Sequence, residues 1–206
     1  MLALLLLFSA CAHAQEAEER LFQAINDGKQ LVAEGIVVRG GAKLDARNAD
    51  GETPLHRAIE KDYRLLTELL VKAGAPVSAR SKNGETPLHY AALHEDPWYV
   101  ELLLLAKADP KARNDDGESV LQWAVMTGNP QTAKYLLERG ADAKAVDLKG
   151  NNVLHGAADG GHLEMTQAFV SMGVDPRQRN RAGKRPLDIA RERGYPELVK
   201  YLQKFQ

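Results

Sequence analysis

Cysteine is almost absent from this sequence of 206 residues, in which Cys11 is the only one. A single cysteine cannot form an internal disulfide, whatever the compartment of the protein. The stability of the folded part must therefore come from the packing of its side chains alone.

No apolar run is long enough to cross a bilayer as a helix, which takes about 20 residues. The longest opens the chain, as Met-Leu-Ala-Leu-Leu-Leu-Leu-Phe over residues 1–8, and stops at small residues. We therefore expect no membrane span. The run instead resembles the apolar core of a secretory signal peptide.

Two cleavage sites compete after this run. The A-x-A motif at 12–14 makes residues 1–14 a signal peptide and the mature protein periplasmic or secreted. The stretch at 8–11 instead resembles a bacterial lipobox, which predicts removal of residues 1–10 and a lipid on Cys11. That lipoprotein would be anchored to the outer membrane. A cytosolic protein that keeps the whole segment is the third interpretation.

The net charge is only −1, but it is unevenly distributed. Residues 177–206 hold nine Lys and Arg against three Asp and Glu, a balance of +6, so the rest of the chain carries −7. Such an end suits an acidic partner or a nucleic acid, or is simply a solvated cap. Because no aromatic side chain stands between its arginines as a stacking platform, we expect no nucleic acid partner.

What the sequence does contain is a repeat with a period of 33 residues. The hexapeptide Gly-Glu-Thr-Pro-Leu-His occurs at 51–56 and again at 84–89. A glycine, a leucine and an alanine recur at this period with no insertion. These columns, meaning residues at the same place in successive repeats, are Gly51, Gly84, Gly117, Gly150 and Gly183; Leu55, Leu88, Leu121, Leu154 and Leu187; and Ala58, Ala91, Ala124, Ala157 and Ala190. A fixed period of this length indicates a repeat array.

Each column has a structural reason. The periodic glycine fits a tight turn with positive φ. A short polar side chain two residues later can cap a helix, by accepting from the free amides of its first turn; the cap column is Thr53, Thr86, Ser119 and Asn152. Leucine and alanine three residues apart then form one apolar stripe. A second helix follows in each repeat, and in three of them it is expected to begin at Pro97, Pro130 and Pro196.

The pattern resembles the ankyrin repeat, through its T-P-L-H-x-A motif, a Gly-His pair at 161–162 and a Gly-Ala-Asp at 140–142. The resemblance implies an all-α fold, an ankyrin-repeat solenoid of about six helix–turn–helix repeats with hairpin-like loop tips. One domain would cover 15–206. Its repeats are expected at about 15–47, 48–80, 81–113, 114–146, 147–179 and 180–206. The histidine of the motif is replaced by Gln122 in the fourth repeat and by Asp188 in the last.

The histidines do not suggest a metal site. His56, His89 and His155 share one column, where the ring is expected to bridge the backbone and the neighbouring loop. Packed helices lie about 8–10 Å apart, whereas zinc ligands converge on the ion at about 2 Å. We therefore expect no metal and no other cofactor. No Ser-His-Asp or Cys-His set remains once the column roles are assigned, so we also expect no enzyme activity.

The resemblance further implies a protein partner, because ankyrin arrays generally bind proteins along a concave face made of first helices and loop tips. We expect the protein itself to be a monomer. Candidate contact residues are Arg47, Asp50, Glu52, Arg80, Lys82, Glu85, His94, Arg113, Asp115, Glu118, Met126, Leu148, Lys149, Arg179, Arg181 and Lys184. The arginines that recur in four of the loops either bind carboxylates of the partner in a bidentate manner or pack the loops together.

A second candidate surface lies on the other side of the array. Trp98 and Leu105 are seven residues apart, hence on one side of their helix, and Leu65 is the matching residue of the preceding repeat. The three form a small apolar patch on the convex surface, with Trp98 as an interaction anchor. Alternatively, the helix start at Pro97 turns the Trp98 ring inward over the edge of the core.

Two functions without catalysis are compatible with these expectations. The first is an exported protein–protein interaction module that binds its partner through the concave face and loop tips. The alternative is a dedicated periplasmic inhibitor or immunity protein that blocks a toxic or lytic enzyme.

Overall fold

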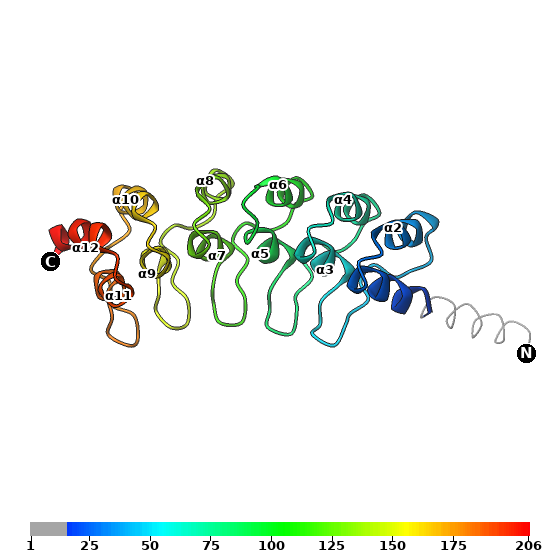
Figure 1. The fold of residues 1–206 in the computed structure, drawn as a ribbon, viewed down its shortest axis with the longest axis horizontal. Coiled ribbons are helices and arrows are strands. Elements are labelled where there is room, and N and C mark those ends of the chain that lie inside the picture. The colour runs from blue at the N-terminus through cyan, green and yellow to red at the C-terminus, as the bar shows by residue number, and fades with distance from the viewer. Residues whose placement is uncertain (1–15) are drawn as a thin grey trace, which may run out of the picture.

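The structure is a computed structural model that describes residues 16–206, and these residues form a single row of helix pairs (Figure 1). Residues 16–26 are helical and precede α2 (Gln30–Arg39). The later pairs are α3 (Pro54–Glu60) and α4 (Arg64–Lys72); α5 (Pro87–Ala91) and α6 (Trp98–Leu105); α7 (Val120–Met126) and α8 (Pro130–Glu138); α9 (Val153–Gly160) and α10 (Leu163–Ser171); and α11 (Pro186–Arg193) and α12 (Pro196–Leu202), followed by the 3-10 turn η1 (Gln203–Phe205).

The helices form two layers, with the loops projecting from one of them. The first helices α3, α5, α7, α9 and α11 make one row, the second helices make the other, and the loops extend beyond the first row (Figure 1). Each first helix begins 33 residues after the previous one. Between residues 16 and 206 no strand forms, and the only bridge pairs Arg113 with Ser119. The predicted all-α solenoid is confirmed.

The core lies between the two layers. The leucine column is fully buried in four repeats and 2% exposed at Leu187, and the alanine column beside it is 0% exposed throughout. Since each helix pair is too small to enclose these side chains, neighbouring repeats cover them for one another.

The loops are narrow turns joined to one another through the main chain. A main-chain hydrogen bond closes each tip across the turn, as from Ser81 N to Glu85 O at 2.8 Å. Adjacent tips are linked as well, for example from Lys82 N to Asp50 O at 2.8 Å. Gly51 has φ +75°, and a Cβ there would lie 2.9 Å from Lys82 N. Glycine is therefore required by both conformation and space.

The histidine column ties each repeat to the next, as expected. His89 Nδ1 accepts from Thr86 N at 3.1 Å, and its Nε2 lies 3.3 Å from Glu118 O in the following loop. Gln122 makes the same pair of contacts: its Oε1 accepts from Ser119 N and its Nε2 donates to Asn151 O, both at 2.9 Å. An amide therefore substitutes for the imidazole without loss of either bond.

One expected helix start is wrong. The second helices α8 and α12 begin at their prolines, but α6 begins at Trp98, with Pro97 in the capping position. The amide of Trp98 donates to Asp96 Oδ1 at 2.9 Å. This local turn uses the free amide of the first residue of the helix.

Replacing Ser119 by Ala should lower the free energy of unfolding by about 1 kcal/mol, the usual value of an N-cap. The Ser119 hydroxyl accepts from Gln122 N at 3.2 Å at the start of α7 and is buried. Urea denaturation measures the change. The exposed Ser78 gives the control, since Ser78→Ala should have almost no effect; equal changes at both positions would contradict the capping role.

Candidate functional site

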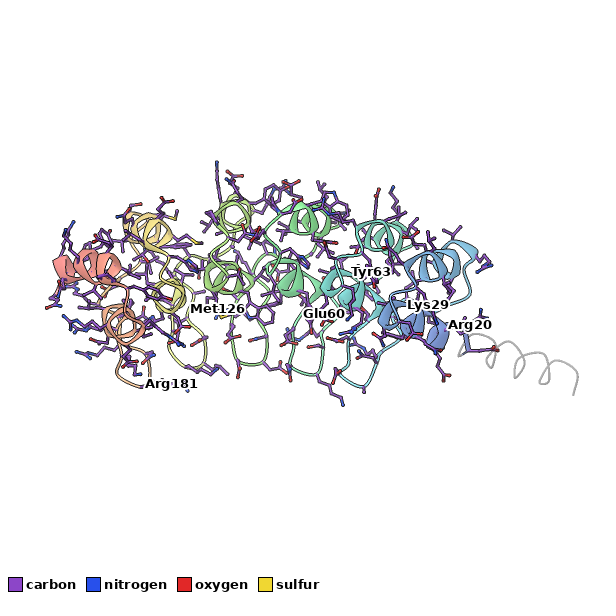
Figure 2. All side chains as sticks on the ribbon, in the orientation of Figure 1. Arg20, Lys29, Glu60, Tyr63, Met126 and Arg181 are labelled. Atoms are coloured by element: carbon purple, nitrogen blue, oxygen red, sulfur yellow. The ribbon has the colours of Figure 1, made fainter. Side chains whose placement is uncertain are left out.

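The tips of the loops expose a mixture of charges. Asp50, Lys82, Asp115, Lys149, Arg181 and Lys184 are all exposed, and Leu148 is exposed beside them. Figure 2 shows Arg181 at such a tip, away from both helix layers. Several of these charges already have partners, as between Lys184 Nζ and Glu192 Oε2 at 2.7 Å. Exposed ion pairs of this kind contribute little to stability and can exchange for contacts with another protein.

The arginine ladder packs the loops together. Arg80 Nη1 donates to Arg113 O at 2.7 Å, and Arg113 Nη1 donates to Val146 O at 2.6 Å, each time one repeat further along. Arg47 makes the same bond to Arg80 O, and Arg179 donates within its own tip to Gly183 O. The second of the two interpretations is therefore the observed contact. Arg80 Nη2 also forms an ion pair with the exposed carboxylate of Asp115, at 2.7 Å.

The prediction that Glu52 contacts a partner is wrong, because this residue is only 6% exposed. Its Oε1 accepts from the Tyr90 hydroxyl at 2.6 Å and its Oε2 from Asn48 Nδ2 at 2.7 Å. Burial, together with the bond to Glu52, raises the pKa of Tyr90, which therefore stays protonated as the donor. The glutamate is oriented inward by the first helix of the next repeat.

Glu85 and Glu118 occupy the same column and are half-buried. Glu85 Oε2 accepts from Ser81 Oγ at 2.8 Å, and Glu118 Oε2 accepts from Asn114 Nδ2 at 2.9 Å and from Trp123 Nε1 at 3.0 Å. One oxygen of each carboxylate therefore braces the loop, and the side chain is only in part available to a partner.

Tyr90 and Trp123 form an aromatic row that the sequence analysis missed. They occupy one column of the first helices, four residues after the cap, and their ring centroids are 6.3 Å apart. The buried rings of His56 and His89 meet them edge-on, at 5.4 and 5.3 Å. The 33-residue spacing between two aromatic residues was the signal that could have identified this row.

The next exposed column lies at the ends of the first helices, or for Leu93 in the turn after α5, and it is apolar in the centre of the array. Leu93 is 44% and Met126 50% exposed. Glu60 lies in the same column, and Figure 2 shows Glu60 and Met126 along the row of first helices. We call the two columns together the first-helix face: Arg57, Tyr90, Trp123, Gly156 and Ile189, with Glu60, Leu93, Met126, Asp159 and Glu192.

His94 is largely packed against its own repeat and the preceding one. Its ring centroid lies 4.7 Å from that of Tyr99, and its Nδ1 is 3.9 Å from Asp62 Oδ1. Its side chain keeps 22% of its surface exposed. A partner would reach only the edge of this ring.

The buried histidines are neutral at physiological pH. Burial lowers the pKa of both His56 and His89 from 6.5 to about 4, and it lowers the pKa of His155 as well. Within residues 16–206, no three His, Cys, Asp or Glu side chains are placed to hold one metal ion. The histidines act as hydrogen-bonding links between repeats.

On the second-helix side, Leu65 and Leu105 are 52% and 71% exposed, but Trp98 is half-buried against the core. The Arg64 guanidinium carbon lies 5.4 Å from the centre of the Trp98 ring, and the Tyr99 ring is 5.0 Å away. The indole therefore covers the edge of the core and stays partly exposed. The expected three-residue patch is reduced to two exposed leucines beside a partly covered ring.

Trp98→Ala should lower the free energy of unfolding by about 1–3 kcal/mol, less than the 3–5 kcal/mol of a fully buried aromatic, because the ring is only half-buried. Urea denaturation measures this value, and Leu105→Ala is the exposed control on the same helix. A change at Trp98 no larger than that at Leu105 would place the ring in solvent.

Among residues 16–206, no helix combines the length and the apolar character that crossing a membrane requires. The expected signal peptide and the alternative lipidation at Cys11 concern residues outside the described part of the chain.

Comparison with known proteins agrees with this geometry. The family model described as ankyrin repeats (3 copies) matches residues 21–114, 96–180 and 121–205. The chain belongs to the ankyrin repeat family, whose arrays are protein–protein interaction modules. The crystal structure of the ankyrin repeat domain of Bcl-3, described as a unique member of the IκB protein family, is 34% identical, with a TM-score of 0.72 over 90% of this chain and 85% of that one. No curated protein matches the sequence.

Proposed function

We propose that this protein is an exported interaction module that binds a protein partner through its first-helix face and loop tips. The observation that carries the proposal is the composition of this face at its centre. Tyr90, Leu93, Trp123 and Met126 lie there in two adjacent columns, between charged loop tips and charged helix ends. Aromatic and methionine side chains with a polar rim are typical of protein interfaces.

The architecture supports a preformed surface. The first-helix face is held by loop-to-loop main-chain bonds, by the arginine ladder and by the buried histidines. Side chains that are already fixed lose less conformational entropy on binding. A partner would therefore contact side chains from several repeats at once, in positions that the stacking has set.

Site-specific crosslinking tests this proposal. A photoreactive amino acid is placed at Leu93 or Met126, and in control variants at two exposed residues of the second-helix layer, Leu31 in α2 and Met172 directly after α10. In the native host, we expect one protein to be crosslinked from both first-helix positions and from neither control, as identified by mass spectrometry. Crosslinking only from Leu31 and Met172 would contradict the proposal, because it would show that the binding site lies on the opposite side.

Export is the part of the proposal that depends on residues 1–14. Expressed from its full gene in a Gram-negative host, the protein should lose its first ten or fourteen residues. Intact mass distinguishes a mature chain that starts at Gln15 from one that starts at a lipidated Cys11. A cytosolic chain that retains Met1 would contradict export while leaving the binding proposal intact.

A further inference from the structure

A hollow of about 200 Å³ interrupts the first-helix face over α9. The column that holds Tyr90 and Trp123 has Gly156 at this point, and Ile189 follows in the next repeat. A Cβ at Gly156 would have its nearest neighbours at 3.9 Å, in Gln122 O and Met126 N. The glycine thus leaves space where other repeats present a side chain.

Apolar and aromatic side chains form part of the walls of the hollow, beside the polar Gln122, Asn151 and Asn152. Trp123 and Met126 border it on one side and Ile189 on the other. Trp123 is oriented by its bond from Nε1 to Glu118 Oε2, at 3.0 Å, and by the edge of the His89 ring. One wall is therefore a fixed indole.

The rim of the hollow is acidic. Glu118 and Asp159 line it, and within residues 16–206 no lysine or arginine does so. Asp147 also lines it, but this residue is buried, and its carboxylate accepts from Asn151 N at 2.7 Å and from Asn151 Nδ2 at 2.9 Å. His155 also lines it, and burial lowers the pKa of this histidine, so it adds no positive charge at neutral pH.

Two cations reach the rim from outside. Arg193 Nη2 binds Asp159 Oδ1 at 2.6 Å, and Lys149 Nζ lies 3.9 Å from Glu118 Oε1. The side chains of both cations are more than half exposed. Contacts of this kind exchange readily, so a cation from a partner can compete for the same carboxylates.

We propose that this hollow receives the side chain of an arginine presented by the protein partner. The guanidinium is planar, so it can stack on the Trp123 ring while its forked N–H groups donate to the carboxylates of the rim. Its aliphatic stem contacts Met126 and Ile189. The inference rests on the proposed function and adds the chemistry of the residue that is recognised.

The test uses two peptide probes that differ in one atom group: acetyl-Gly-Ser-Arg-Ser-Gly-amide and the same peptide with citrulline in place of arginine. Citrulline keeps the shape but not the charge. NMR follows the indole N–H of Trp123, with that of Trp98 on the opposite side as the internal reference. We expect the arginine probe to shift the Trp123 signal, and the citrulline probe to bind at least about tenfold more weakly, since charge-assisted contacts are lost.

Two further variants are designed so that each fills one hollow with a larger side chain. Gly156→Leu fills the proposed site on a helical residue without a positive φ, so it needs no strained backbone. Ala168→Leu is the matched control: it fills an apolar hollow of about 490 Å³ between α8 and α10 on the other side, in a column that holds Leu69, Leu102, Tyr135 and Tyr201 elsewhere. We expect Gly156→Leu to abolish the shift and Ala168→Leu to leave it unchanged.

A third variant keeps the inference testable if Gly156→Leu fails to fold. Asp159→Asn should weaken binding of the arginine probe by about threefold or more and reduce its dependence on NaCl concentration. Equal binding of both probes, or a shift that persists in folded Gly156→Leu, would overturn the inference. A partner that still crosslinks to Leu93 in Gly156→Leu would then show that the proposed function holds without this pocket.

Discussion

The free energy of unfolding should fall steeply as the pH is lowered from about 6.5 towards 4. Burial lowers the pKa of His56 and His89 from 6.5 to about 4 in the folded protein, and that of His155 shifts in the same direction. All three side chains are at most 2% exposed. This is the largest effect that we expect from a change of conditions.

The direction follows from the protons bound in each state. Between pH 6.5 and 4 the unfolded chain binds protons on these histidines, whereas the folded chain does not, so acid favours unfolding. Their contribution is fully present above pH 6.5 and is lost as the pH falls through the folded pKa values. The lowering of the pKa from 6.5 to about 4 corresponds to a loss of roughly 3 kcal/mol in the free energy of unfolding for each of His56 and His89.

Urea denaturation at a series of pH values measures this loss. The control is the double variant His56→Gln and His89→Gln, because Gln122 already makes both bonds of this column in the fourth repeat. The variant should fold at pH 7 and lose much less stability than the natural chain on acidification. An unchanged pH dependence would show that other groups cause the acid sensitivity.

Leu88→Ala should lower the free energy of unfolding by about 2–5 kcal/mol, the range found when a buried leucine leaves a cavity. Leu88 is 0% exposed in α5, which packs between α3 and α7. The helices on both sides also pack against their own second helices, α4 and α8, so the space should be refilled only in part.

Chemical denaturation monitored by circular dichroism gives this value. Leu105→Ala, at a 71% exposed position of the adjacent α6, removes the same atoms from the surface and should change stability by less than about 0.5 kcal/mol. Similar losses at Leu88 and Leu105 would contradict the assignment of the leucine column to the core.

The repeated elements could be predicted from the sequence because their causes are local. Glycine at a turn with positive φ, a polar cap and an apolar stripe each act within a few residues, and the 33-residue period confirms each of them several times. The bridging role of the histidine column was implied instead by the resemblance to the ankyrin repeat, because its bond to the next loop joins residues 29 positions apart. The start of α6 was not predicted correctly, because Asp96 forms its own turn before the helix.

The direction of individual surface side chains was decided by the neighbouring repeat. Glu52 was expected at the surface, but a tyrosine hydroxyl from the next first helix holds it inside. The choice between the two roles of the arginines depended on carbonyl groups 33 residues away. Such contacts arise only after two repeats stack, so the positions of charged residues in the sequence do not reveal them.

The sequence by itself therefore determined the class of fold, the order of the repeats and most of the buried columns. Only the tertiary structure decided which exposed columns form one surface. In the sequence, Tyr90, Trp123 and Gly156 do not indicate a common site. The stacking of the repeats places an aromatic wall next to an open space with an acidic rim. The physical reason is that a binding surface on a solenoid is made by side chains from different repeats, whose relative positions are set by the packing between helices.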